Sequence, residues 1–126
     1  MKNVLIVEDE DDIAQLLLFS LRGADYSVRW ARSGEEGVEI ARAKAPDLVL
    51  LDVSLPGIPG WTVCETLRAE EATRGVPIVF LTARTGSDDL RRGLLAGGTA
   101  YLLKPFDPVA LRQTIERLLA KEPVRP

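Results

Sequence analysis

Five short apolar stretches alternate along the chain with longer stretches in which apolar residues recur every three or four positions. A short apolar run is typical of a strand buried on both faces, and the wider spacing is typical of an amphipathic helix. Alternating strands and helices predict parallel strands joined by right-handed helical crossovers. The expected strands lie at residues 4–7, 26–31, 47–51, 76–81 and 99–103.

Local signals predict where the intervening helices begin and end. Gly23 is expected to close the first helix, and Ser33 is expected to cap the second with its side chain. The third helix is expected to end before Gly75. We expect Asp107 to cap the last helix with Pro108 at its first position, because the first helical residue does not need a bonded N–H.

The number of strands and the chain length limit the fold. Five strands suit an α/β fold with a single doubly wound, flavodoxin-like parallel sheet in the order 2-1-3-4-5 and five helices. The 126 residues are far too few for an eight-stranded barrel. We expect one domain over residues 1–120 and a disordered C-terminal tail over residues 121–126, which are polar and contain proline.

Composition and charge narrow the possible chemistry. The formal net charge of -3 gives no electrostatic signature of nucleic-acid binding. No apolar run approaches the ~20 residues of a membrane helix, and Glu8 interrupts any signal-peptide core, so we expect a cytoplasmic protein. The chain has no histidine and one cysteine, which excludes histidine triads and multi-cysteine zinc sites. Carboxylates, hydroxyls, lysine and arginine must therefore carry any chemistry.

Polar residues stand at the ends of four of the five expected strands. In an open parallel sheet the carboxyl ends of the strands share one edge, and ligands bind there. We therefore expect these side chains to meet in one small cleft. They are Glu8 and Asp9 after the first strand, Asp52 after the third, Thr82 after the fourth and Lys104 after the fifth.

The residue types in this cleft point to phosphoryl chemistry. Three neighbouring carboxylates raise one another's pKa values or require a cation, and Mg²⁺ suits such oxygen ligands best. A hydroxyl and an ammonium group beside them can each bind one oxygen of a phosphoryl group. Asp52, the acid nearest the middle, is the expected nucleophile.

Four segments, taken together in their order and spacing, carry a resemblance to a known family. They contain the acids after the first strand, the aspartate ending the third, the Leu-Thr-Ala-Arg run and the Lys-Pro-Phe run. Over nearly its whole length the chain resembles the receiver domain of bacterial two-component response regulators, of the chemotaxis-regulator type. The segments are residues 4–10, 47–57, 81–84 and 101–106.

The resemblance implies a phosphoacceptor switch of a two-component phosphorelay. Asp52 would accept a phosphoryl group from a sensor histidine kinase or a phosphotransfer protein. The implied cofactor is Mg²⁺, bound directly by Asp9 and Asp52, through water by Glu8, and by the backbone carbonyl of Ser54. Such a domain is not an enzyme with a separate substrate, although it catalyses its own phosphotransfer and slow dephosphorylation.

The resemblance also implies how the switch works. Thr82 and Lys104 bind the phosphoryl oxygens, and Tyr101 matches the family's aromatic switch position. As Thr82 moves toward the phosphoryl group, Tyr101 rotates inward, and the surface of the fourth helix, fifth strand and fifth helix changes. Arg84 is expected to control water access to the acyl phosphate. The peptide bond between Lys104 and Pro105 is expected to be cis.

The implied output is control of a partner through this surface. The partner is either a downstream protein or an output domain outside this sequence, and the chain itself is expected to bind neither nucleic acid nor membrane. Two positions depart from the family pattern. Pro59 stands where an aspartate is common, and residues 99–100 are Thr-Ala where an acidic pair is common. Loss of the acidic pair speaks against a conventional dimer on this face.

The sequence fits other classes of protein less well. A phosphatase of the haloacid dehalogenase type needs a second acid two residues after its nucleophile, where this chain has Ser54. A flavodoxin-like electron carrier needs a hydroxyl- and glycine-rich loop after the first strand, where this chain has five acids. A receiver that only mediates contacts would not need the full set of site residues. The Gly-Lys-Ser/Thr loop of P-loop enzymes is missing from the sequence.

Overall fold

The computed structural model describes residues 1–23, 25–82 and 87–120. Arg84 and the expected tail over 121–126 lie outside the described residues, so the expectations for them stay predictions. The strands are β1 (Lys2–Val7), β2 (Tyr26–Ala31), β3 (Leu48–Asp52), β4 (Ile78–Thr82) and β5 (Ala100–Leu103). The helices are α1 (Asp11–Ser20), α2 (Gly34–Ala43), α3 (Gly60–Ala69), α4 (Ser87–Ala96) and α5 (Pro108–Ala120).

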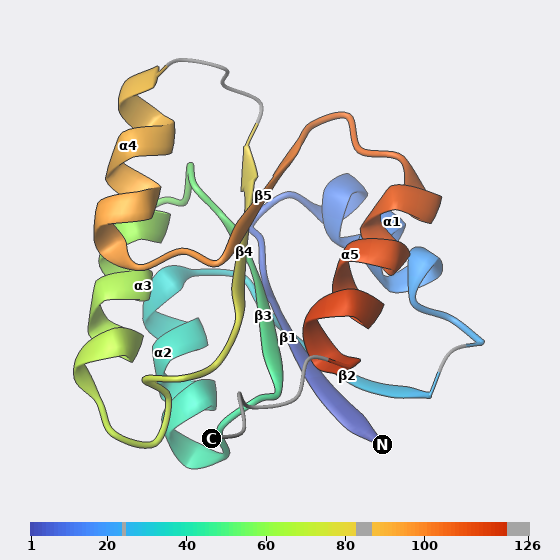
Figure 1. Cartoon of the computed structure of the whole chain (residues 1–126), viewed down its shortest axis with the longest axis horizontal. Helices are drawn as coiled ribbons and strands as arrows, with labels where there is room; N and C mark the ends of the chain where they lie inside the picture. The colour runs from blue at the N-terminus through green and yellow to red at the C-terminus, as the bar shows by residue number, and fades with distance from the viewer. Residues whose placement is uncertain (24, 83–86, 121–126) are drawn as a thin grey trace, which may run out of the picture.

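The strands form one parallel sheet in the order β2-β1-β3-β4-β5. Helices α2, α3 and α4 cover one face of this sheet, and α1 and α5 cover the other (Figure 1). The doubly wound fold predicted from the sequence is therefore confirmed. Within the described ranges, no helix is both long enough and apolar enough to span a lipid bilayer.

Alternate residues of the central strands pack into two separate apolar layers. Leu5 and Val7 of β1 join the core that includes residues of α2, α3 and α4. Val4 and Ile6 join the core that includes residues of α1 and α5. All four side chains are fully buried, and burial of each such side chain favours folding by about 1.5–3 kcal/mol. This double burial explains why β1 reads as a continuous apolar run.

The register brings the functional ends of the strands to one edge. Val7 pairs with Leu51 across β1 and β3, so the residues that follow β1 lie beside the end of β3. Asp52 pairs with Leu81, which places Thr82 one residue further along the neighbouring strand. The register and the parallel direction of the strands therefore place the polar residues at the strand ends, which the sequence singled out, at one edge of the sheet.

Most of the predicted helix boundaries are found. The Ser33 side chain accepts a hydrogen bond from the backbone N–H of Glu36 (3.1 Å), and the Asp107 side chain accepts one from Val109 N–H (3.2 Å). Gly23 follows α1 with φ +78, a conformation that favours glycine.

The third helix ends before Gly75, as the sequence predicted. Helix α3 ends at Ala69, and a turn occupies the following residues. The Thr73 hydroxyl (2.6 Å) and the N–H of Glu70 (3.3 Å) both donate to the carbonyl oxygen of Leu67, which lies in the last turn of the helix.

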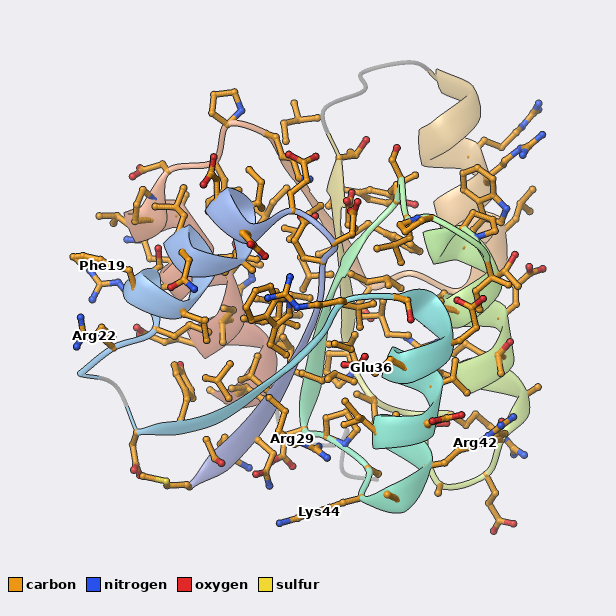
Figure 2. The ribbon with its side chains drawn as sticks, turned by 180° about the vertical axis from the view of Figure 1, so that it is seen from behind. Phe19, Arg22, Arg29, Glu36, Arg42 and Lys44 are labelled. Carbon is orange, nitrogen blue, oxygen red and sulfur yellow. The ribbon has the colours of Figure 1, made fainter. Side chains whose placement is uncertain are left out.

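Strand β2 is one edge of the sheet, and an arginine on it contacts the end of helix α2. The Arg29 guanidinium donates to the carbonyl oxygens of Ile40 (3.4 Å) and Lys44 (3.0 Å), at the end of α2. Figure 2 shows Arg29 and Lys44 at this end of the helix, and shows Phe19 and Arg22 projecting outward near the end of α1. Arg29 therefore binds carbonyl groups of the last turn and C-cap of α2, where the Ile40 carbonyl oxygen also accepts from the N–H of Lys44 (3.2 Å).

Candidate functional site

A lysine bridges two buried carboxylates at the carboxyl edge of the sheet. The Lys104 ammonium group lies 3.0 Å from Glu8 Oε1 and 3.3 Å from Asp52 Oδ1. Glu8 is 0% exposed and Asp52 is 3% exposed. The structure thus brings together side chains from the ends of β1, β3 and β5, as the sequence predicted.

The electrostatics of the cluster favour additional positive charge. Burial and, after it, the nearby charge of Asp52 raise the pKa of Glu8 to about 7, against the opposing effects of the Glu10 N–H and the Lys104 side chain. Burial acts to lower the pKa of Lys104, but its hydrogen bond to Glu8 and the charge of Asp52 raise that pKa above its usual value. One ammonium group therefore does not fully compensate the two buried carboxylates.

This raised pKa predicts a pH-dependent stability in the absence of metal. The folded protein holds a proton on Glu8 up to about pH 7, whereas the unfolded chain releases it near pH 4.5. The stability from this group is therefore fully present below pH 4.5 and is lost as the pH rises through 7. We expect the free energy of unfolding, relative to the Glu8→Gln variant, to fall by on the order of 3 kcal/mol over this range.

Urea unfolding of both proteins in chelator at several pH values measures this difference. The exposed Glu39 of α2 offers a matched control through Glu39→Gln. A difference between wild type and Glu8→Gln that stays flat or grows with pH would contradict the electrostatic account.

The loop after β1 contributes a second group of carboxylates. Carboxylate oxygens of Glu8, Asp9 and Glu10, one from each residue, lie within 4.8 Å of one another. Oδ1 of Asp9 is buried and has no hydrogen-bond partner among the described residues. A buried carboxylate oxygen without a donor is strongly disfavoured unless a cation approaches it. The donor set of this loop, with Asp52 close by, therefore fits a hard divalent cation such as Mg²⁺.

The turn after β3 holds the Asp52 carboxylate in place. The backbone N–H of Ser54 donates to Asp52 Oδ1 (3.2 Å), and the N–H of Gly60 donates to the carbonyl oxygen of Val53 (3.0 Å). A Cβ on Gly60 would lie 2.9 Å from Cα of Val53, closer than real Cβ atoms approach other atoms. Gly60 thus lets the start of α3 approach the end of β3. The expected role of the Ser54 carbonyl as a metal ligand stays a prediction.

The predicted phosphoryl-binding hydroxyl also lies at this edge. Thr82 ends β4 and is only 2% exposed. Its carbonyl oxygen accepts a hydrogen bond from the N–H of Lys104 (2.8 Å), so the ends of β4 and β5 are joined at this point. The peptide bond between Lys104 and Pro105 is cis, as expected.

Tyr101, the predicted switch residue, lies on β5 and packs against the core that includes residues of α3 and α4. Its ring stacks on Phe80 of β4, with 5.5 Å between the ring centroids and 19° between the planes. Burial, followed by the charge of Cys64, raises the pKa of the Tyr101 hydroxyl. Tyr101 is thus packed against the same layer that contains buried Cys64, whose thiol donates to the Ala96 carbonyl oxygen (3.2 Å). Its role as a switch stays a prediction.

Trp30 is a supporting residue that the sequence did not single out. Its indole N–H donates to the carbonyl oxygen of Glu8 (2.8 Å), so it helps to hold the acidic loop. The Arg32 guanidinium lies 4.1 Å from the Trp30 ring centroid and also pairs with Asp11. The sequence signal that could have found this role is the position of Trp30 near the end of β2, the strand next to β1.

Fold and site together define a class of protein. The molecule is a doubly wound α/β domain with a buried lysine and an acidic cluster at the carboxyl ends of its parallel strands. Comparison with known proteins identifies the family. The family model of the response regulator receiver domain matches residues 4–116. The chain therefore belongs to the response regulator receiver domain family.

Individual relatives agree with this assignment. The chain is 38% identical over 125 residues to the DNA-binding response regulator MtrA of Mycobacterium tuberculosis, an alignment covering 99% of this chain and 54% of MtrA. The chain thus spans about half the length of the curated relatives it matches. A Chloroflexus aurantiacus structure described as a response regulator is 41% identical, with a TM-score of 0.91 and 95% and 98% of the two chains covered.

Another solved structure bears on the cation. The receiver domain of the sensor histidine kinase PA1611 from Pseudomonas aeruginosa is 32% identical to this chain, with a TM-score of 0.89. The alignment covers 95% of this chain and 98% of that domain. In that structure a magnesium ion is coordinated in the active-site cleft.

Proposed function

We propose that Asp52 is the phosphoacceptor of this receiver domain and that it takes the phosphoryl group from a sensor histidine kinase or a phosphotransfer protein. The observation that carries the proposal is the Lys104 ammonium group between the carboxylates of Glu8 and Asp52. A permanent cation beside a buried nucleophilic carboxylate is positioned to bind the anionic group that is transferred. A cytoplasmic location agrees with such a donor.

Mg²⁺ is the proposed cofactor. Asp9, Asp52 and the Ser54 carbonyl would hold it, with Glu8 acting through water. The Oδ1 atom of Asp9, which has no hydrogen-bond partner among the described residues, supports this donor set. When bound, Mg²⁺ neutralises carboxylate charge and attracts the oxygens of a phosphoryl group.

The residues of the chain divide the remaining tasks of phosphotransfer. A carboxylate oxygen of Asp52 forms a bond to phosphorus, while the bond from phosphorus to the donor nitrogen breaks and its electron pair stays on that nitrogen. Lys104 shifts its pairing from the free carboxylates to one phosphoryl oxygen. The Thr82 hydroxyl donates to another. Burial of these groups excludes water, which strengthens each interaction.

The phosphoryl group then biases the conformation of the domain. It adds about two negative charges and strong acceptor oxygens at Asp52. Converting a 1:99 population to 99:1 requires a differential free energy of roughly 5.5 kcal/mol. A few charge-assisted hydrogen bonds, at about 1.5–3 kcal/mol each, can supply this amount. Movement of Thr82 and Tyr101 would change the surface of α4, β5 and α5, which controls a downstream protein or an output domain.

The step from Thr82 to the surface makes a separate prediction. Thr82→Ala should leave Asp52 phosphorylation largely intact, because the nucleophile and Lys104 remain. The response of the α4, β5 and α5 surface should be blunted, because the hydroxyl that follows the phosphoryl group is lost. Backbone amide NMR shifts, recorded before and after phosphorylation, measure the response.

Thr66→Ala is the control for this experiment, because Thr66 lies on α3 and its hydroxyl only donates back to Thr62 of the same helix. A response in Thr82→Ala as large as in the wild type would exclude Thr82 from the pathway.

Acetyl phosphate tests the proposed function without knowledge of the kinase. We expect the intact mass to rise by one phosphoryl group after incubation with acetyl phosphate and Mg²⁺. No mass gain under conditions in which the protein stays folded would reject the proposal and favour a receiver that acts only by contact.

A further inference from the structure

Two glycines enclose the stacked pair of Phe80 and Tyr101. A Cβ on Gly98 would lie 2.6 Å from Cε2 of Phe80, and a Cβ on Gly93 would lie 2.7 Å from Cζ of Tyr101. The N–H of Gly98 donates to the carbonyl oxygen of Gly93 (2.9 Å), so the two glycines are joined at the end of α4. The aromatic pair therefore packs directly against the backbone of this segment.

Gly93 cannot be explained by a need for an unusual backbone conformation. It lies in the interior of α4, and the glycines with positive φ among the described residues are Gly23, Gly57 and Gly97. Glycine is unfavourable inside a helix relative to alanine. Its position is explained by space, because a Cβ would also lie 2.9 Å from Cε1 of Tyr101 and closer still to the hydroxyl oxygen.

We infer that Gly93 is a positioning residue. Because Gly93 has no side chain, the hydroxyl end of Tyr101 can pack directly against its Cα. The name "Tyr101 seat" is used below for Gly93, Phe80 and Gly98. A methyl group at Gly93 requires either that Tyr101 leaves the seat or that α4 moves away from β5.

The seat connects the phosphoryl site to the surface of α4. Phe80 and Thr82 are two residues apart on β4 and so point to the same face of the sheet. Thr82 lies at the site, Phe80 stacks on Tyr101, and Tyr101 rests on Gly93. This regulatory consequence rests on the proposed function, whereas the seat itself can be tested without phosphorylation.

A double-mutant cycle tests the seat. With Tyr101 present, Gly93→Ala should lower the urea midpoint of unfolding, because the added methyl group overlaps the tyrosine ring. In a Tyr101→Ala background the same change should raise the midpoint, because the overlap is gone and alanine favours the helix. The expected result is thus a reversal of sign.

Gly75→Ala is the matched control, since a Cβ there meets no atom within 4 Å. Its effect on the midpoint should be equal in the two backgrounds. If Gly93→Ala changed the urea midpoint in the same direction in both backgrounds, the proposed packing of Tyr101 on Gly93 would be contradicted.

Fluorine NMR tests the regulatory consequence. The chain has two tyrosines, so labelling with 3-fluorotyrosine gives two resonances, and Tyr26→Phe assigns that of Tyr101. In Gly93→Ala the Tyr101 resonance should move toward the position of an exposed tyrosine. Its change on addition of acetyl phosphate and Mg²⁺ should be lost, while the mass gain persists.

The possible failures are distinguishable. If the Tyr101 resonance of Gly93→Ala, and its change on addition of acetyl phosphate and Mg²⁺, were the same as in the wild type, Gly93 would not have a positioning role. A missing mass gain in the wild type would overturn the proposed function, and the stability cycle would then still decide whether the seat exists.

Discussion

Replacing Asp52 with asparagine is expected to abolish phosphorylation by acetyl phosphate. Asparagine keeps the shape of the side chain and an oxygen that can accept from the Ser54 N–H, so the turn after β3 should persist. It removes the anionic oxygen that attacks phosphorus. We expect the rate to fall by at least about 10³-fold, in the range seen when a nucleophile is removed. Time-resolved intact-mass measurement gives the rate.

The control for this variant is Asp12→Asn, because Asp12 is an exposed acid at the start of α1. It should be phosphorylated as the wild type is. If the Asp52→Asn protein were phosphorylated at the wild-type rate, the acceptor would have to be another residue and the proposed mechanism would be contradicted.

Replacing Asp9 with asparagine is expected to weaken Mg²⁺ binding. The buried Oδ1 of Asp9 has no hydrogen-bond partner among the described residues and is the oxygen best placed to gain from a cation. Even changes outside the ligand shell typically lower metal affinity about 10- to 100-fold, so loss of a ligand should cost at least as much. Phosphorylation should slow in parallel at limiting Mg²⁺.

The structure offers a probe for this titration. The indole of Trp30 is bonded to the carbonyl oxygen of Glu8, next to the proposed ligands, so its fluorescence should report Mg²⁺ binding. The Asp12→Asn protein again serves as the control. An unchanged Mg²⁺ affinity in Asp9→Asn would exclude Asp9 as a ligand.

The sequence predicts the sheet and the convergence of its polar ends because both follow from local patterns. The run from Leu48 to Leu51 is apolar throughout since both faces of β3 are buried. Parallel strands then force Asp52 and the acids after β1 to the same edge. The Lys104 contacts with Glu8 and Asp52 confirm this convergence.

Contacts between side chains and distant backbone groups could not be predicted in this way. The bond from Trp30 to the Glu8 carbonyl and the approach of Tyr101 to Gly93 depend on how neighbouring elements pack. The hydrogen bond from the Thr73 hydroxyl to the Leu67 carbonyl oxygen, in the turn after α3, likewise depends on local packing. Sequence periodicity does not contain such information, because each of these residues is also compatible with other environments.

Thr99 shows how a departure from the family pattern acquires a structural explanation. Its hydroxyl oxygen accepts from the N–H of Ile78 (2.9 Å) and from the Arg68 guanidinium (3.3 Å). Arg68 also donates to the carbonyl oxygen of Gly97 (2.9 Å). Thr99 thus joins α3 to the start of β4, and Arg68 extends this network to the end of α4. Where the resemblance leads one to expect an acid, this chain has a residue that makes internal hydrogen bonds.

We propose above all that Asp52 accepts a phosphoryl group at a site that needs a divalent cation. The most direct test is to locate the modified residue by peptide mass spectrometry after incubation with acetyl phosphate, in Mg²⁺ and in chelator. We predict modification at Asp52 alone, and only with Mg²⁺. Modification at a different residue, or equal modification of Asp52 in chelator, would contradict the account.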